Sequence, residues 1–346
     1  MSKKTIDKLI TFGMVIVAFI ICQVMISNGS MSRSLRGQLV PICVYIVMAV
    51  SLNLTVGISG ELSLGHAGFM SVGAFSGVVM AMWLKNGMGV SDTMICLSAA
   101  LLTGGLFAGI AGVLIGIPVL RLRGDYLAIV TLAFGEIIRN VMNCIYISIE
   151  GSKLHFGFVN PKLPGKLLIN GPAGATGVTK MSTFVMGFVL IMITLLVVLN
   201  LIDSRSGRAI MAIRDSRIAA ESVGLRVTKY KMMAFVTSAV LAGMAGALYG
   251  LNFSTITASK FKFDTSILVL VFVVLGGIGN IRGSIIAATL LTVLPELLRA
   301  FSDYRMLVYA IVLILVMLAS NNPTLRTFFN GLKPGKKSSA AKEDKP

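Results

Sequence analysis

The sequence carries little charge for its length. Lys, Arg, Asp and Glu make up 13% of the 346 residues, against about 25% in ordinary soluble domains, and 55% of the residues are hydrophobic. This balance excludes an ordinary soluble domain and predicts an integral membrane protein.

Acidic residues are especially scarce. The chain has 31 Lys and Arg but only 14 Asp and Glu, so its formal net charge is +17. The basic residues lie between apolar runs and at the chain ends, not on one face. This distribution fits membrane topology and contact with anionic membrane lipid, and it does not predict nucleic acid as a partner.

Catalytic and metal-binding patterns are missing. There are only two histidines, and the four cysteines lie within or beside apolar segments without a CxxC spacing. No GxxxxGK[ST] motif occurs, so this chain is not expected to bind ATP through a P-loop. Nothing resembles a Ser/His/Asp set, an HExxH site or a clustered carboxylate pair. We expect no enzyme activity, no resident metal and no cofactor.

Apolar runs predict about ten membrane spans, each close to the ~20 residues that cross a bilayer. The first, Leu9 to Ile26, follows three lysines and has no Ala-x-Ala cleavage site, which favours an uncleaved span over a signal peptide. The others are predicted at 38–57, 67–84, 93–117, 126–147, 183–202, 232–252, 266–280, 284–301 and 306–320.

Positive charges predict the orientation. With both termini in the cytoplasm, the inside segments hold about 19 of the 31 basic residues. The predicted permease domain is 1–331, with an external loop at 148–182 that serves as a docking surface or lid. The polar, basic tail at 332–346 is predicted to be disordered and cytoplasmic.

The longest polar interruption, residues 203–231, contains five arginines and two lysines. A helix is predicted to start at Arg214-Asp215-Ser216, where Asp215 or Ser216 can cap it, and to end at Gly224 in a left-handed conformation. Ala219, Ala220 and Val223 would form a small apolar stripe suited to another protein's groove. The alternative is a basic loop that serves only topology.

A glycine-rich stretch interrupts apolar sequence between Asn53 and Phe69. Freed backbone at membrane depth must be buried in protein or line a watery cavity, so this stretch is a candidate broken helix on a transport path. The alternatives are an ordinary cytoplasmic turn and close helix packing through glycine. The candidate path residues here are Asn53, Gly57, Gly60, Glu61, Ser63, His66 and Gly68.

Ionisable residues also occur inside predicted spans. Glu136 and Arg139 are spaced i, i+3, and Glu296 and Arg299 repeat the pattern. Each pair could neutralise itself on one helix face or line the path, and the spacing leaves both readings open.

Four blocks carry a resemblance to a known family. They read SLNLTVGISGELSLGHAGFMSVGAF, RLRGDYLAIVTLAFGEIIRNV, GRAIMAIRDSRIAAESVGLRVTKYK and GGIGNIRGSIIAATLLTVLPELLR. From about Val40 to Leu318 the chain resembles the LivM-type permeases of branched-chain amino acid ABC importers. The first span lies outside the match, and the end of the last span, ASNNPTLRTFFNG, departs from the family pattern.

The resemblance implies an all-α membrane protein of the vitamin-B12-type (type II) importer fold, with two inverted related halves at spans two to five and seven to ten. It implies two ABC ATPase subunits that bind the ATP, a LivH-type sister permease and an extracytoplasmic amino-acid-binding protein, in a bacterial inner membrane. Residues 209–224 would contact the ATPases, with Ala219, Ala220 and Glu221 matching the family's A-A-E and Gly224 its glycine, although their order departs from E-A-A-x-x-x-G. Flanking charges at Arg214, Asp215 and Arg217 belong to the same predicted coupling loop.

Alternative functions remain open at this point. Related permeases carry urea or short amides. A stand-alone secondary transporter would use Glu136 or Glu296 as a proton site, and a membrane enzyme is disfavoured by the scarcity of histidine and clustered acids.

Overall fold

The computed structural model describes residues 3–29, 31–122, 124–158 and 163–298, and a few positions between 304 and 314. Two compact units are separated at residue 296, and only scattered residues of the second, Leu297–Pro346, are described. The predicted span at 306–320, the tail at 332–346 and Arg299 lie largely or wholly outside the described residues.

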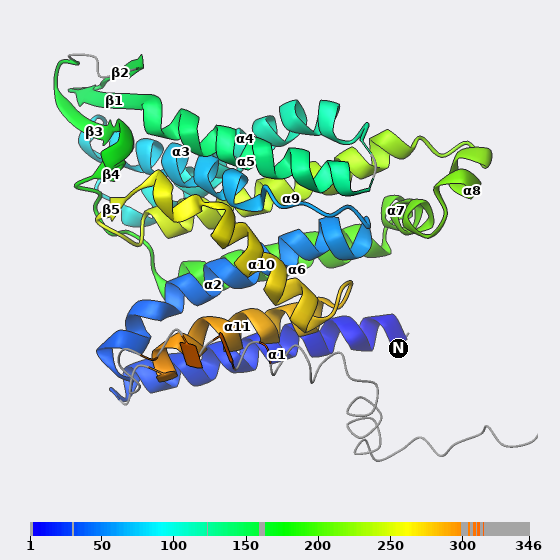
Figure 1. The fold of residues 1–346 in the computed structure, drawn as a ribbon. Helices are drawn as coiled ribbons and strands as arrows, with labels where there is room; N and C mark the ends of the chain where they lie inside the picture. Colours follow the sequence, from blue (N-terminus) through cyan, green and yellow to red (C-terminus); the bar gives the residue numbers. More distant parts are fainter. Residues whose placement is uncertain are drawn as a thin grey trace, which may run out of the picture. The chain divides into compact units, whose positions relative to one another are not determined.

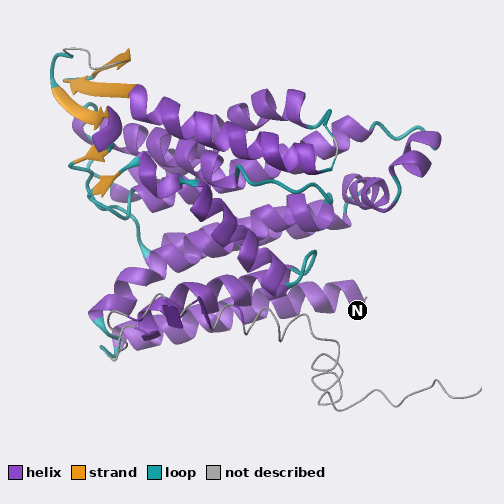
Figure 2. Ribbon diagram, in the orientation of Figure 1, coloured by secondary structure: helices purple, strands orange, loops and turns teal. Residues whose placement is uncertain are grey.

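The first unit is mostly helical (Figures 1 and 2). Its helices are α1 (Lys3–Ser27), α2 (Arg33–Asn53), the π-helix η1 (Leu54–Ile58), α3 (His66–Asn86), α4 (Thr93–Val119), α5 (Asp125–Cys144), η2 (Gly171–Ala173), α6 (Phe184–Asp203), α7 (Arg205–Asp215), α8 (Arg217–Ser222), α9 (Val227–Gly250), η3 (Ala258–Phe261), α10 (Phe263–Gly276) and α11 (Ile281–Leu297). The strands are β1 (Ile145–Glu150), β2 (Lys153–Phe158), β3 (Lys166–Asn170), β4 (Ala175–Thr176) and β5 (Thr255–Ile256).

Seven of these helices are long and apolar enough to cross a membrane within the described part of the chain. They are α1 to α6 and α9, and each coincides with a predicted span. The predicted spans at 266–280 and 284–301 are the shorter helices α10, with 14 residues, and α11, with 17.

Local signals at the helix starts agree with the observed boundaries. Ser32, Asp92 and Thr183 each accept a hydrogen bond from a backbone N–H in the first turn of α2, α4 and α6. Such caps satisfy donors that the helix itself leaves unpaired. The first turns are therefore encoded locally.

The core is formed where α3, α4 and α9 pack through small residues. A Cβ added to Gly73 would lie 2.0 Å from the carbonyl oxygen of Gly243, and one added to Gly246 would lie 2.0 Å from the carbonyl oxygen of Met70. Close backbone approach of this kind is how helices associate where the surroundings are as apolar as their side chains. By contrast, α1 is largely exposed and contacts α6 through Phe19, which stacks on Phe184 and Phe188.

The expectation of an all-α protein is wrong in one region. The predicted external loop contains most of a small five-stranded antiparallel sheet of order β2-β1-β3-β4-β5, with β5 contributed from the segment after α9. The sequence signal was the alternation in IYISIE, where Ile147 and Ile149 are buried and a turn at Gly151, with φ +59°, follows. Because α5 ends at Cys144, the predicted span at 126–147 is shorter than expected.

The helices place distinct features at their two ends (Figure 1). The sheet lies at one end. The start of α1, helices α7 and α8, and the turn between α10 and α11 lie at the other end, from which the segment 59–65 runs back toward the start of α3. Helices α2 and α9 run in opposite directions between these ends.

Candidate functional site

The polar stretch 203–231 forms two short helices. α7 is capped by Ser204, whose Oγ accepts from the backbone N–H of Gly207 at 3.0 Å, and α8 by Ser216, whose Oγ accepts from Ala219 at 3.3 Å. Ser216 is thus the cap, and Asp215 instead accepts from the Arg214 guanidinium at 3.0 Å. Gly224 has φ +85° and follows the last turn of α8, as predicted. The sequence had located α8 but not α7.

The predicted apolar stripe on α8 does not face one way. Ala220 is buried and packs with Ile213 of α7 and Val227 of α9. Val223 and Ile218 are 83% and 81% exposed. Because successive helical residues are rotated by about 100°, Ile218 lies on the face opposite Ala220, whereas Val223 follows the last helical residue, Ser222, as the C-cap. The outward face therefore consists of Ile218, Ala219 and Val223, with Ile218 missed by the sequence reading.

The charged residues of α8 pair with each other. Arg217 Nε donates to Glu221 Oε1 at 2.8 Å across one turn. Both side chains are substantially exposed, so this pair contributes little to folding stability. The charges remain available to a partner.

The glycine-rich stretch is a real interruption of helix structure. After Asn53, α2 continues as the π-helix η1, and residues 59–65 are non-helical before α3 begins at His66. π-Helical turns are rare and occur frequently at functional sites. Gly60 has φ +75°, a conformation that favours glycine.

Asn53 ties this interruption to the turn before α11. Its Nδ2 donates to Ser284 Oγ at 2.9 Å, and its Oδ1 accepts from the backbone N–H of Gly279 at 2.9 Å. A Cβ on Gly57 would lie 2.4 Å from that same Gly279 nitrogen. Asn53 is fully buried, and Gly57 is required by close backbone approach.

The interruption and the predicted coupling loop, residues 203–231, are in direct contact. Arg214 Nη1 of α7 donates to the carbonyl oxygen of Gly57 at 2.9 Å. The side chain lies against Gly60, where an added Cβ would meet Arg214 Cγ at 2.6 Å. Lys231, at the start of α9, forms an ion pair with Glu61, and these side chains are only 14% and 12% exposed. Movement of α7 or of the start of α9 is thereby linked to residues 57–61.

His66 lies away from this contact, in the helix packing. Its Nε2 is 2.8 Å from Ser51 Oγ, and Ser51 Oγ donates to the carbonyl oxygen of Met48. Since that serine proton is used, the geometry assigns the donated proton to His66 Nε2. Ser238 Oγ donates to the carbonyl oxygen of Ser51 at 2.5 Å, so this polar cluster joins α2, α3 and α9. This geometry favours a structural role for His66.

The end of the interruption and the start of α3 contact α5. Ser63 is buried and its hydroxyl has no partner among the described residues. The neighbouring Leu64 N–H donates to Thr131 Oγ1 at 3.0 Å. A Cβ on Gly68 would lie 3.1 Å from Gly135 Cα, so Gly68 lets α3 approach α5 closely.

Glu136 and Arg139 pair on α5. Arg139 Nε donates to Glu136 Oε2 at 2.7 Å, and their side chains are 21% and 32% exposed for arginine and glutamate. Asn140 and Asn143, which the sequence reading missed, continue the same helix face at i+4 and i+7 from Glu136. α5 is long enough to cross a membrane, and its polar stripe is only partly buried by the rest of this chain.

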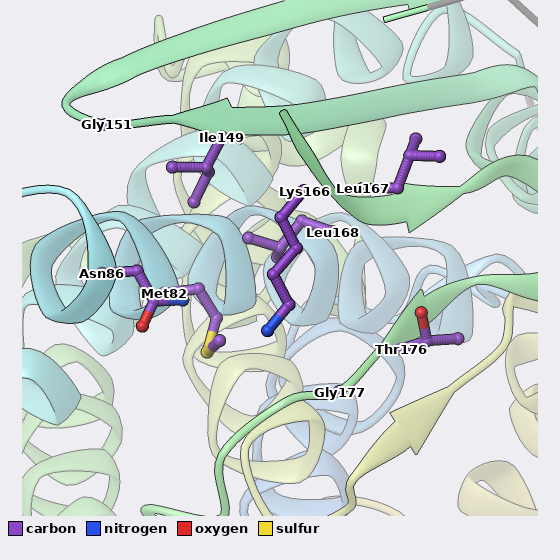
Figure 3. Close-up of a pocket in the computed structure, with 9 residues that line it drawn as sticks. All are labelled: Met82, Asn86, Ile149, Gly151, Lys166, Leu167, Leu168, Thr176 and Gly177. Carbon is purple, nitrogen blue, oxygen red and sulfur yellow. The ribbon is translucent and has the colours of Figure 1, made fainter. Parts of the chain in front are cut away.

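A pocket of about 210 Å³ lies at the opposite end, between the end of α3 and the sheet (Figure 3). Met82 and Asn86 come from α3, and Lys166 and Thr176 from the strands. The Lys166 side chain extends into the space between them (Figure 3). No group of three or more potential metal ligands occurs among the described residues.

Comparisons with known proteins agree with the membrane architecture. Residues 35–317 match the family described as branched-chain amino acid transport system, permease component. The chain is 35% identical over 328 residues to the high-affinity branched-chain amino acid transport system permease protein LivM of Salmonella typhimurium strain LT2, covering 90% of this chain and 73% of that protein. It is 36% identical over 291 residues to LivM of Escherichia coli K12, covering 80% of this chain and 66% of that protein.

A second type of permease is also similar. The high-affinity branched-chain amino acid transport system permease protein LivH of Salmonella typhimurium strain LT2 is 26% identical over 283 residues, covering 79% of this chain and 88% of that protein. No solved structure matches. Because the family match extends from α2 to beyond α11, this multi-pass membrane protein belongs to the family of permease components of branched-chain amino acid transport systems.

Proposed function

We propose that this chain is a transmembrane subunit of an ATP-driven importer whose substrates are branched-chain or other neutral amino acids. The family and the two LivM relatives support the substrate class. ATP is bound by partner subunits, and this chain carries no cofactor. The fold is of the vitamin-B12 type with two inverted halves, which the opposite directions of α2 and α9 support.

The observation that carries the proposal is the hydrogen bond from Arg214 to the Gly57 carbonyl oxygen. Two ATPase subunits would be present, one on each permease. The ATPase on this chain would bind residues 209–224 through the exposed side chains of Ile218, Ala219 and Val223. When the ATPases close on ATP, α8 moves, and Ala220 carries the motion to Ile213 of α7 because the two are packed together. Arg214 then displaces the interrupted helix and shifts the path between outward-facing and inward-facing states.

The orientation follows from charge. The end that holds the start of α1, α7, α8 and Arg282 is cytoplasmic, because basic residues concentrate there. Both termini are cytoplasmic in a bacterial inner membrane. The sheet is then external, where an amino-acid-binding protein docks beside the pocket at Lys166.

The polar stripe on α5 is the proposed path surface. A LivH-type sister permease would cover Glu136, Arg139, Asn140 and Asn143, since ionisable residues within a membrane face a bundle interior or a cavity. Neutral substrates suit a path in which the two charges cancel. Permeation of urea or short amides would use the same surface.

Co-purification tests the proposal. The chain is tagged, extracted in mild detergent, and its partners are identified by mass spectrometry. We expect a P-loop ATPase and a second permease to co-purify. Transport by the purified chain alone in vesicles, without ATP and following the proton gradient, would instead establish a secondary transporter with Glu136 as the proton site.

A further inference from the structure

A second pocket, of about 570 Å³, lies at the proposed cytoplasmic end among α1, α6, α7 and the start of α11. Its walls include apolar side chains of α6, among them Leu199 and Ile202. Its charged residues are Asp7, Lys8, Asp203, Arg208, Arg214 and Arg282. The volume lies in the range of sites that hold small ligands or headgroups. The pocket is separate from the α5 stripe and from the exposed face of α8.

Three of the four cations already have a carboxylate partner. Lys8 Nζ lies 2.6 Å from Asp203, and Arg282 Nη2 lies 3.0 Å from Asp7. Arg214 pairs with Asp215, just outside the pocket. These pairs fix the positions of the cations and leave the site with one uncompensated positive charge.

That charge is on Arg208. Its Nη1 donates to the backbone carbonyl oxygen of Asp203 at 3.0 Å, and it has no carboxylate partner among the described residues. A guanidinium has five N–H donors in a planar fork, so most of the donors of Arg208 are unused. A planar fork of this kind suits a phosphate oxygen pair.

The surroundings favour a lipid as the source of the anion. α1 presents an exposed apolar face with Leu9, Val17, Ile20 and Val24, which acyl chains can cover. Basic pockets between membrane helices on the cytoplasmic side bind anionic headgroups. We propose that this pocket binds the phosphate of an anionic phospholipid of the inner leaflet, with Arg208 as the principal donor and Lys8 beside it.

Because the pocket lies between α7 and α1, a bound lipid would affect the movement of α7 during transport. Arg208 and Arg214 are on α7, the helix that contacts the interrupted segment, whereas Lys8 is on α1. A headgroup held between them clamps α7 against α1. The inference rests on the proposed orientation, which places this end in the cytoplasmic leaflet.

The test measures lipid retained by the full chain after purification from membranes containing phosphatidylglycerol and phosphatidylethanolamine. Wild type should be enriched in phosphatidylglycerol relative to the membrane. Arg208→Gln should reduce the affinity for phosphatidylglycerol roughly fivefold, the effect of one Lys or Arg near an anionic surface. Arg205→Gln is the matched control, because it removes the same charge from the same helix outside the pocket.

Two further measurements separate the outcomes. Thermal unfolding of each protein in phosphatidylglycerol nanodiscs is compared with phosphatidylcholine nanodiscs, and the difference cancels any basal loss of stability in a variant. We expect this difference to shrink in Arg208→Gln and to persist in Arg205→Gln. To distinguish a lipid from a free phosphate, glycerol phosphate is added to the protein in phosphatidylcholine nanodiscs. It should not raise the unfolding temperature.

Three results would overturn the proposal. They are equal retention of both lipids by wild type, equal loss in the two variants, or full stabilisation by free glycerol phosphate. If Arg208→Gln loses its selectivity for phosphatidylglycerol while the ATPase still co-purifies, the lipid site within the importer is confirmed. If wild type retains its selectivity for phosphatidylglycerol but no ATPase co-purifies with it, only the importer proposal is refuted.

Discussion

At the scale of single residues, Arg214 makes the contact on which we propose that coupling depends. It joins α7 to a carbonyl 157 residues earlier in the chain, in the π-helix η1. A hydrogen bond to a charged group is worth about 1.5–3 kcal/mol.

Arg214→Gln is expected to reduce substrate-stimulated ATP hydrolysis and uptake at least about tenfold, because the contact to Gly57 is lost. Uptake and ATPase activity are measured in proteoliposomes with the co-purified complex. Arg226→Gln removes an exposed charge nearby and should leave both rates unchanged. Equal behaviour of the two variants would contradict the role of Arg214.

Gly60→Ala should be more harmful than Gly89→Ala. Both glycines have positive φ, at +75° and +68°, so both substitutions incur a backbone penalty of about 1 kcal/mol. Only at Gly60 does the new Cβ meet Arg214 Cγ, at 2.6 Å, whereas Gly89 has open space. We expect similar thermal stabilities but reduced uptake for Gly60→Ala alone. Unchanged uptake would show that the Arg214 position tolerates displacement.

At the scale of elements, α8 divides its apolar residues between the molecule and a partner. Ala220 anchors it to α7 and α9, while Ile218 and Val223 are exposed. Exposed apolar side chains on an otherwise charged short helix favour a protein partner. α5 makes a comparable division between exposed apolar side chains, among them Ile129 and Ile137, and a polar stripe.

The double variant Ile218→Asp, Val223→Asp should abolish co-purification of the ATPase without loss of membrane insertion. Its charges would be desolvated in the interface, and each costs several kcal/mol. Thr228→Asp, at the exposed start of α9, is the control. The measurement is the ratio of ATPase to permease after affinity purification, and retention of the ATPase would place its binding surface elsewhere.

Glu136→Gln is expected to reduce uptake severalfold, because Arg139 is left without its carboxylate. The informative variant is Glu136→Gln, Arg139→Gln, in which no unpaired charge remains. If these residues line the path, the double variant stays impaired, as we expect, with ATPase co-purification intact. Recovery of uptake would mean that the pair only neutralises itself.

At the scale of the whole molecule, the bundle depends on backbone contact among α3, α4 and α9. Side-chain removal cannot test such contacts, but addition of a methyl group can. Protein interiors are packed as densely as organic crystals, so a Cβ added where two helices touch must move a whole helix.

Gly246→Ala should lower the unfolding temperature by several degrees and reduce the amount of folded protein, since its Cβ would lie 2.0 Å from the Met70 carbonyl oxygen. Gly13→Ala on α1 meets nothing within 4 Å and should be neutral or slightly stabilising. Thermal unfolding in detergent, followed by size-exclusion chromatography, measures both. A neutral Gly246→Ala would show that α9 is not held so closely to α3.

The sequence by itself determined the membrane class, the positions of the long spans, the capped start of α8 at Asp215 or Ser216, and its end at Gly224. These follow from hydropathy over about 20 residues and from hydrogen bonds within one turn, which are local properties. The alternation that forms β1 was equally local and was overlooked.

Only the tertiary structure decided that Arg214 contacts Gly57, that Lys231 pairs with Glu61, and that Asn53 holds the turn at Gly279. It also turned Ala220 inward and placed His66 in the packing. Each depends on how helices far apart in sequence cross and which face they present. The physical reason is that hydropathy and capping act along the chain, whereas these contacts act between helices.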